Sequence, residues 1–199
     1  MPVISPPSAI APGISYEPGG MFDPDVIRVD TRHRVLALDG LFCPCVIGKG
    51  GARPAADKRE GDGATPLGDW PVRAVLLRPG RITLADLGGR LSVPWRWIRD
   101  NDGWCDDPAD SAYNRPVALP RPTSHERLAR EDQAYDALVI LGHNDAPPAP
   151  RLGSAIFFHQ WVTGPGGAPR ATEGCVAVAP ESMRAILPLL RPGMTMRIG

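Results

Sequence analysis

The sequence has no long apolar run and no surplus of charge of either sign. No segment approaches the roughly 18 apolar residues that a membrane-spanning helix needs, so we expect no membrane span. Lysine and arginine number 22, aspartate and glutamate also number 22, and the formal net charge is zero. Such a chain sets up no long-range field that would gather nucleic acid or anionic lipid. Nucleic acid is therefore disfavoured as a partner, and specificity is expected to lie in a local site.

Cysteine is also scarce. The chain has four cysteines, at positions 43, 45, 105 and 175, and none belongs to a C-x-x-C pair. This spacing is typical neither of a dense disulfide framework nor of a structural zinc site. The first residues lack both a basic segment and an unbroken apolar segment, so a secretory signal is not visible.

Glycine and proline, in contrast, are abundant, with 22 and 24 residues. They predict many turns and short strands. Residues 1–28 are rich in both and show no period of 2 or 3.6, which indicates an extended leader. Residues 29–199 are expected to form one domain, because 43% of the chain is hydrophobic and this suffices for a core.

Short apolar segments between turn residues predict a mainly β fold. Asp39 and Gly40 tolerate the positive φ of a tight hairpin turn, so residues 32–38 and 41–47 are expected to pair. Further strands are predicted at residues 70–77, 81–87, 137–141, 154–159, 175–178 and 194–198. Short helices are predicted at residues 123–135 and 180–190. The lack of strand–helix alternation favours a mixed β-sandwich or barrel-like fold with one or two short helices.

Residues 95–121 combine turn-forming residues with three of the five tryptophans, at positions 95, 97 and 104. Large rings in a loop-like segment are seldom left unpacked. We therefore expect this segment to form a wall of a cleft, with Trp104 among the residues that contact substrate.

His159 and Cys175 are the sharpest candidates for chemistry. His159 ends a strongly apolar strand, and Cys175 follows a polar turn that contains Gly174. A neighbouring imidazole can take the proton of a thiol and so make it a nucleophile. Gly174 permits close backbone approach, so that its N–H and that of Cys175 could point at an oxyanion. The alternative is a buried cysteine with a purely structural role.

Four blocks of sequence occur in a fixed order along the chain. They are KREGDGATPLG at residues 58–68, DGWCDDP at 102–108 with YN at 113–114, GSAIFFH at 153–159, and TEGCVA at 172–177. Together they resemble the L,D-transpeptidase catalytic domain (YkuD-like), and in particular its branch of small single-domain bacterial proteins. The resemblance spans about residues 33–198.

The resemblance implies a reaction and a set of roles. In that family a cysteine attacks the carbonyl after the third residue of a peptidoglycan stem peptide, expels the terminal D-amino acid and passes the acyl group to an amine. Carried over, Cys175 is the nucleophile and His159 the general base, with no metal and no organic cofactor. The partners would be stem peptides, as donor and as acceptor, and carbapenems would acylate the thiol. We expect a monomer in the periplasm or cell envelope.

Further residues are candidates for substrate binding. Thr172 and Glu173 precede the nucleophile, and Glu173 stands where the family pattern has a second histidine. Arg170 could pair with a substrate carboxylate, although its position is more typical of a plain surface arginine. His143 and Asn144 follow an apolar strand, and they either line the same cleft or belong to a surface turn.

Two other functions stay open at this point. Transfer of the acyl group to water would give an L,D-carboxypeptidase, which differs only in the acceptor. A zinc-binding or non-catalytic cell-wall module is the third possibility, with His143, His159 and Cys175 as ligands. Three nitrogen and sulfur ligands suit a catalytic zinc with an open position.

Overall fold

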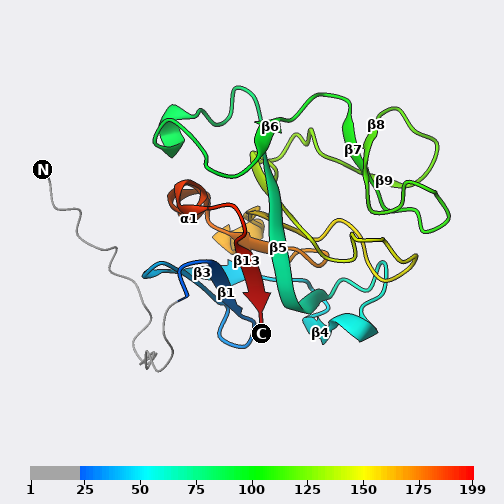
Figure 1. Ribbon diagram of the computed structural model, residues 1–199, viewed down its shortest axis with the longest axis horizontal. Helices are drawn as coiled ribbons and strands as arrows, with labels where there is room; N and C mark the ends of the chain where they lie inside the picture. The colour runs from blue at the N-terminus through cyan, green and yellow to red at the C-terminus, as the bar shows by residue number, and fades with distance from the viewer. Residues whose placement is uncertain (1–22) are drawn as a thin grey trace, which may run out of the picture.

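The computed structural model describes residues 23–199, and the prediction for residues 1–22 lies outside the described residues. The strands are β1 (Val26–Asp30), β2 (Val35–Leu38), β3 (Leu41–Val46), β4 (Ala52–Pro54), β5 (Thr65–Leu77), β6 (Trp95–Trp97), β7 (Asp102–Cys105), β8 (Pro116–Ala118), β9 (His125–Arg127), β10 (Ala137–Leu141), β11 (Phe157–Gln160), β12 (Val176–Val178) and β13 (Thr195–Ile198). The helices are α1 (Pro180–Ile186) and the 3-10 turns η1 (Ala55–Asp57), η2 (Ala85–Leu87), η3 (Pro165–Gly167) and η4 (Leu187–Leu189). Figure 1 shows how these elements are arranged.

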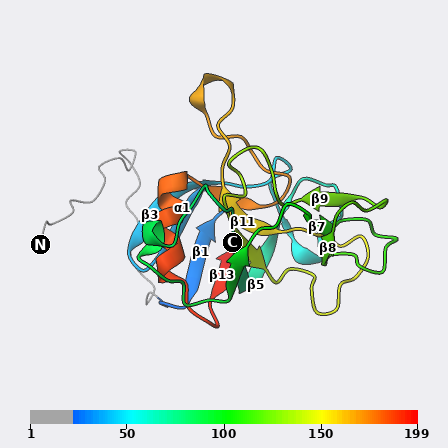
Figure 2. The same ribbon diagram turned by 90° about the horizontal axis from the view of Figure 1, so that it is seen from above.

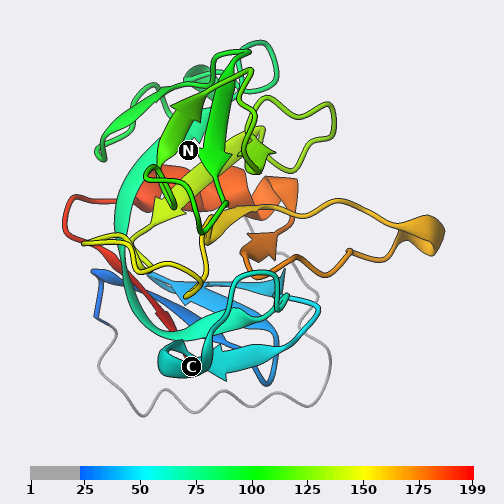
Figure 3. The ribbon, with the colours of Figure 1, turned by 90° about the vertical axis from the view of Figure 1, so that its right-hand side faces the viewer.

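The large sheet closes on itself through the long strand β5. The strand order is β10-β11-β12-β3-β2-β1-β13-β5, and β5 also pairs with β10. The first part of β5 pairs with β13, and the second part pairs with β10. Figure 3 shows β5 curving along the side of the sheet. The mainly β, barrel-like fold expected from the sequence is thereby confirmed.

The hairpin of β2 and β3 follows the predicted turn. Asp39 and Gly40 have φ of 51° and 81°, which are the positive values that a two-residue hairpin turn requires. Inside the barrel, Leu36 of β2 belongs to one large apolar cluster with residues of the other strands. Helix α1 contributes Met183 and Ile186 to this cluster, and both are fully buried.

A second, small sheet with the order β8-β7-β9 stands beside the large one (Figure 1). Its central strand β7 carries Trp104, whose ring meets the ring of Phe157 of β11 edge-on at 5.2 Å. Around this contact lies a separate apolar cluster that also contains Leu138 of β10 and Cys175. The segment 95–121, expected to be loop-like, thus forms β6, β7 and β8 and packs over one face of the large sheet.

Two predicted elements are wrong, because tertiary contacts override local preference. Residues 123–135 form no helix: β9 pairs with β7, and the Thr123 hydroxyl donates to Asp110 instead of capping a helix. Residues 81–87 form no strand. The Asp86 carboxylate accepts hydrogen bonds from the N–H and hydroxyl of Thr83, which favours the turn that leads into η2.

Two boundaries also differ from the sequence interpretation. Strand β1 begins at Val26, inside the segment 1–28 that was expected to be an extended leader. Its pairing with both β2 and β13 explains the order of these residues. Helix α1 ends at Ile186 and continues as the 3-10 turn η4, whose residue Pro188 removes one helical N–H donor.

A projecting arm joins β11 to β12. The two strands run parallel, so the chain must cross over between them. Residues 161–171 make this connection as a narrow loop, in which Thr163 bridges Pro169 and the N–H of Arg170 donates to the carbonyl of Val162. Figures 2 and 3 show the arm extending away from the body.

Among residues 23–199, no helix is both long enough and apolar enough to cross a membrane.

Candidate active site

The parallel pairing of β11 and β12 brings Cys175 and His159 to one face of the sheet. His159 is opposite Ala177 in the register, and Cys175 lies two residues before Ala177. Side chains two residues apart along an extended chain point to the same face. Cys175 and His159 therefore face the same side, and both line one groove of about 390 Å³. We call it the thiol groove.

The Cys175 thiol is held by backbone atoms. The N–H of Phe157 donates to Sγ at 3.3 Å, and Sγ donates to the carbonyl of Ala155, also at 3.3 Å. Burial raises the pKa of Cys175 to about 12, and the N–H of Phe157 opposes this only in part. The thiol is therefore protonated at neutral pH, and a nucleophilic role would require a base.

His159 is a neutral imidazole with one nitrogen available. Its Nδ1 lies 2.7 Å from the carbonyl oxygen of Gln160, which can only accept, so Nδ1 carries the hydrogen. The ring packs edge-on against Tyr135 at 5.2 Å. Burial lowers the pKa of His159 to about 4. Nε2 thus offers its lone pair at neutral pH, as a general base requires.

Thr172 and Gly174 shape the turn that carries the thiol. The Thr172 hydroxyl donates to the carbonyl of Cys175 at 2.6 Å and accepts the N–H of Gly174 at 3.2 Å. Gly174 has a φ of 141°, and a Cβ there would lie 2.9 Å from the carbonyl oxygen of Ala64. The glycine is therefore needed for close packing. Its N–H, expected to point at an oxyanion, instead bonds to Thr172 in this structure.

Charged side chains surround the thiol groove, with an excess of carboxylates. The lining carboxylates are Glu60, Asp106, Glu126, Asp132 and Glu173, and the lining cations are Lys58, Arg130 and Arg170. Glu173 pairs with Lys49 at 2.8 Å, and both side chains are largely exposed. Arg170 is exposed at the base of the arm and also lines the groove, as a substrate-binding residue would have to.

Three candidates for substrate contact do not line this groove. His143 is buried, and its ring lies between the carbonyl of Leu152, at 3.0 Å from Nε2, and the ring of Trp70. It is neither a cleft residue nor a surface-turn histidine. The Asn144 side chain donates to two backbone carbonyls of its own loop. Trp104 lines a different cavity, so the predicted tryptophan wall does not face the thiol.

The sequence interpretation missed several groove residues. Lys58 is almost fully buried, and its Nζ donates to Asp62 at 2.6 Å. Arg130 lies over the ring of Tyr135, 5.1 Å from its centroid, and pairs with carboxylates on both sides. The Lys-x-x-x-Asp spacing in the glycine-rich block could have predicted the ion pair of Lys58 with Asp62. Arg130 and Tyr135 were hidden by the wrong helix assignment.

The structure does not bring together the ligands expected for the zinc alternative. In the described range 23–199, no three histidine, cysteine or acidic side chains gather closely enough to hold a metal ion. His143 in particular bonds to a backbone carbonyl away from the groove.

The fold and the groove define a mainly β catalytic-type domain in which a thiol and an imidazole share one open groove. The chain belongs to the L,D-transpeptidase catalytic-domain family, YkuD, whose family model matches residues 24–198. Membership of this family implies an acyltransferase domain. No curated protein sequence matches the chain.

Several solved structures are similar to the chain at low identity. An L,D-transpeptidase from Mycobacterium smegmatis is 12% identical with a TM-score of 0.41, over 87% of this chain and 58% of that one. The L,D-transpeptidase (residues 123–326) from Xylanimonas cellulosilytica is 14% identical with a TM-score of 0.37, over 87% and 59%. A third, an L,D-transpeptidase in complex with imipenem, is 11% identical with a TM-score of 0.35, over 87% and 58%. The chain thus spans less than two thirds of their length.

Proposed function

We propose that this protein is a cysteine-dependent L,D-transpeptidase that acts on peptidoglycan stem peptides. The observation that carries the proposal is that His159 of β11 and Cys175, directly before the neighbouring parallel strand β12, both line one groove. The family supplies the reaction class, since its domain is an acyltransferase. The groove supplies a protonated thiol and a neutral base at neutral pH.

The first half of the reaction forms a thioester. Nε2 of His159 accepts the thiol proton as Sγ of Cys175 attacks the donor carbonyl. The carbonyl oxygen becomes an anion, for which we assign the backbone N–H groups of Gly174 and Cys175. The Gly174 N–H makes a long bond to a hydroxyl, and an anionic oxygen is the stronger acceptor. The C–N bond then breaks, and His159 returns the proton to the departing amine.

The second half transfers the acyl group to an amine. His159 accepts a proton from the attacking acceptor amine, the new C–N bond forms, and the C–S bond breaks. The leaving thiolate takes the proton back from the imidazolium. The carboxylate-rich groove favours a substrate that carries an ammonium group. We assign Glu173 at the rim to such a contact, and Arg170 to a substrate carboxylate.

The L,D-carboxypeptidase alternative uses the same acyl-enzyme and passes it to water. The groove is open and lined by polar side chains, so water has access to the thioester position. The two activities are separated by their products: an amine acceptor is incorporated in one case and a free tripeptide acid is released in the other.

A carbapenem experiment tests the proposal directly. The protein is mixed with imipenem and its intact mass is measured. We expect one covalent adduct on the wild type, none on Cys175→Ala, and an unchanged adduct on Cys105→Ala, which removes a buried cysteine outside the groove. A folded wild type without any adduct would overturn the thiol mechanism.

The site of action follows from the substrate. Because peptidoglycan lies outside the cytoplasmic membrane, we propose a periplasmic or cell-envelope location and action as a monomer. Fractionation of cells that express the full-length protein tests the location, and sedimentation tests the oligomeric state. Recovery of the protein only with cytoplasmic markers would contradict the location.

A further inference from the structure

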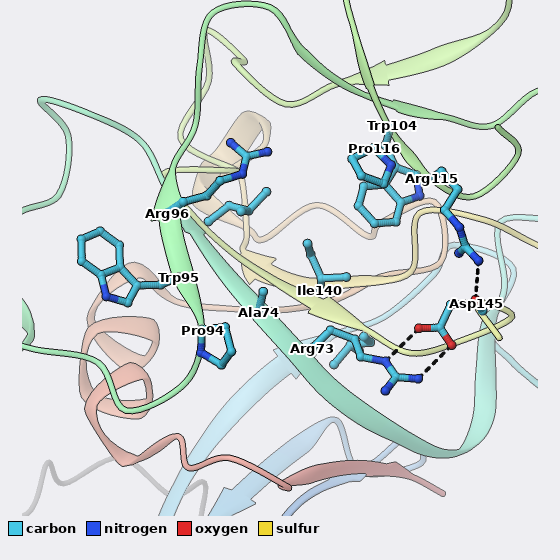
Figure 4. Close-up of a pocket in the computed structure, with 12 residues that line it drawn as sticks. Arg73, Ala74, Pro94, Trp95, Arg96, Trp104, Arg115, Pro116, Ile140 and Asp145 are labelled. Carbon is cyan, nitrogen blue, oxygen red and sulfur yellow. Dashed lines mark hydrogen bonds and ion pairs between the residues drawn. The ribbon is translucent and has the colours of Figure 1, made fainter.

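A second cavity lies between the small sheet and the strands β5 and β10 (Figure 4), and none of its lining residues lines the thiol groove. Its volume is about 400 Å³, and Ala74 and Leu76 of β5 and Ile140 of β10 contribute apolar side chains to it. Trp104 lines this cavity and packs on Phe157. Phe157 in turn donates its N–H to the Cys175 thiol, so the Trp104–Phe157 contact stands between the two spaces.

Three arginines surround this apolar floor, and we call the space the arginine cavity. Figure 4 shows Arg73, Arg96 and Arg115 around it. Two of them are neutralised by carboxylates. Arg73 makes two bonds to Asp145, at 2.8 and 3.0 Å, and Arg96 donates to Asp102 at 2.5 Å.

Arg115 has no such partner. Its Nη2 donates to the backbone carbonyl of Asp145 at 2.7 Å, and its Nη1 donates to that of Asn114 at 3.2 Å. Within residues 23–199, no carboxylate lies within ion-pair distance of this guanidinium, and its Nε–H has no acceptor. The backbone thus holds Arg115 in place and leaves its charge available at the cavity.

The charge and the floor together define a ligand class. The thiol groove has more lining carboxylates than cations, whereas the arginine cavity has three lining arginines and one lining carboxylate, Asp145. An apolar floor with one available guanidinium suits a carboxylate attached to a small apolar group. Cationic ligands are disfavoured there by the same charge.

We propose that the arginine cavity binds the C-terminal carboxylate and the last small apolar residues of a short peptide, with Arg115 as the carboxylate partner. The inference rests on the proposed function for the source of the peptide, because stem peptides end in a D-amino acid with a free carboxylate. The chemistry of the cavity itself is independent of the thiol.

The test uses the full chain, labelled with ¹⁵N, and N-acetyl-D-alanyl-D-alanine as the probe. We expect its addition to shift the indole and backbone signals of Trp104 and the backbone signals of Arg96 and Ile140. The C-terminal amide of the same dipeptide should bind at least tenfold more weakly, since it lacks the negative charge. Arg115→Gln should weaken the free acid by about the same factor, whereas Arg90→Gln, the same change at an exposed arginine, should not.

Two further measurements show where the ligand binds. Binding should persist in the imipenem adduct, and equally in Cys175→Ala, because the thiol groove is not needed. The inference is overturned if the acid and the amide bind alike, if Arg115→Gln binds as well as the wild type, or if the probe shifts only signals around Cys175. Failure of the proposed function shows differently, as a missing imipenem adduct with the cavity shifts intact.

Discussion

The thiol groove and the arginine cavity are close in volume and have no lining residue in common, and their polar groups are held in different ways. At the thiol groove, the candidate residues Cys175 and His159 are each 7% exposed, and their side chains bond to backbone atoms. At the arginine cavity, the arginines stand at a partly exposed rim. Arg73 and Arg96 pair with carboxylates, whereas Arg115 bonds only to backbone carbonyls.

The two sites therefore suit different roles: one controls protonation state, and the other selects a ligand by its charge. Burial sets the protonation state of a group, because a neutral thiol and a neutral imidazole tolerate a site of low polarity better than their ions do. A partly exposed rim keeps its charges and can select a ligand by sign, but water screens each pair. Changes beside the thiol should therefore act strongly on rate and on pH dependence, and changes at the rim should act weakly on stability.

The largest expected effect comes from removing the base. His159→Gln should slow acylation of Cys175 by imipenem by about 10²- to 10⁴-fold, the usual contribution of a general base. His125→Gln removes a histidine outside the groove and should leave the rate unchanged. Stopped-flow or mass-resolved acylation kinetics measure both. Equal rates for His159→Gln and the wild type would show that the imidazole does not activate the thiol.

The buried imidazole should also make stability depend on pH. The pKa of His159 is about 4 in the folded protein against an ordinary value of 6.5. Between these values the unfolded chain binds a proton that the folded chain does not, so stability falls as pH falls from about 6.5 to 4. The contribution is about 3 kcal/mol.

Urea unfolding at several pH values measures this dependence. In His159→Gln the fall between pH 6.5 and 4 should shrink, while carboxylates elsewhere contribute equally to both proteins. If the two curves run parallel, His159 is not held neutral by burial.

The next effect concerns the turn before the thiol. Gly174→Ala places a Cβ 2.9 Å from the carbonyl of Ala64 at a φ of 141°, and should cost about 2 kcal/mol together with most of the activity. Gly88→Ala is the matched control, because its φ is also positive, at 75°, but its Cβ would meet nothing within 4 Å. If thermal unfolding showed equal losses of stability for the two variants, backbone strain and not the contact with Ala64 would account for the loss.

A smaller effect is expected from the hydroxyl that holds the Cys175 carbonyl. Thr172→Val removes the 2.6 Å bond to that carbonyl and the acceptor of the Gly174 N–H. We expect a loss of about 1 kcal/mol in stability and a fall in acylation rate. Thr163→Val, on the arm, should change neither. A Thr172→Val protein with an unchanged rate would remove Thr172 from the positioning of the nucleophile.

The smallest effect should be at the rim of the arginine cavity. Asp145→Asn breaks the ion pair with Arg73, whose side chain is 44% exposed, and should cost less than about 1 kcal/mol. It also removes a negative charge, so the acidic dipeptide should bind slightly more tightly. Denaturant midpoints and titration of the probe measure both. Weaker binding of the probe would show that Asp145 contributes to the site other than by its charge.

The sequence predicted the parts of the molecule that local chemistry controls. The Asp39–Gly40 turn, the strands at 137–141 and 194–198 and the helix that opens at Pro180 all appear within a few residues of the expected bounds. The conformational preferences of turn residues and short apolar runs do not depend on contacts with distant parts of the chain. The choice of His159 and Cys175 rested on residue type, on the strands around them and on the family resemblance, and their catalytic roles stay a prediction.

The predictions that were wrong concern segments whose structure is set by contacts with distant parts of the chain. Residues 123–135 carry helix-capping residues, but pairing of β9 with β7 outweighs that weak preference. His143 is polar and was assigned to a cleft or to the surface, yet Trp70 and the Leu152 carbonyl bury it. The groove residues Lys58 and Arg130 come from segments far from Cys175 in the chain.

By itself, the sequence determined the β-rich fold class, because this depends on short patterns of residue type, and it singled out Cys175 and His159 as candidates with the help of the family resemblance. Only the tertiary structure decided which charges line the thiol groove, that Trp104 faces another cavity, and that Arg115 keeps a charge without a carboxylate partner within residues 23–199. Burial and pairing depend on neighbours from distant parts of the chain, and spacing along a sequence does not determine which neighbours these are.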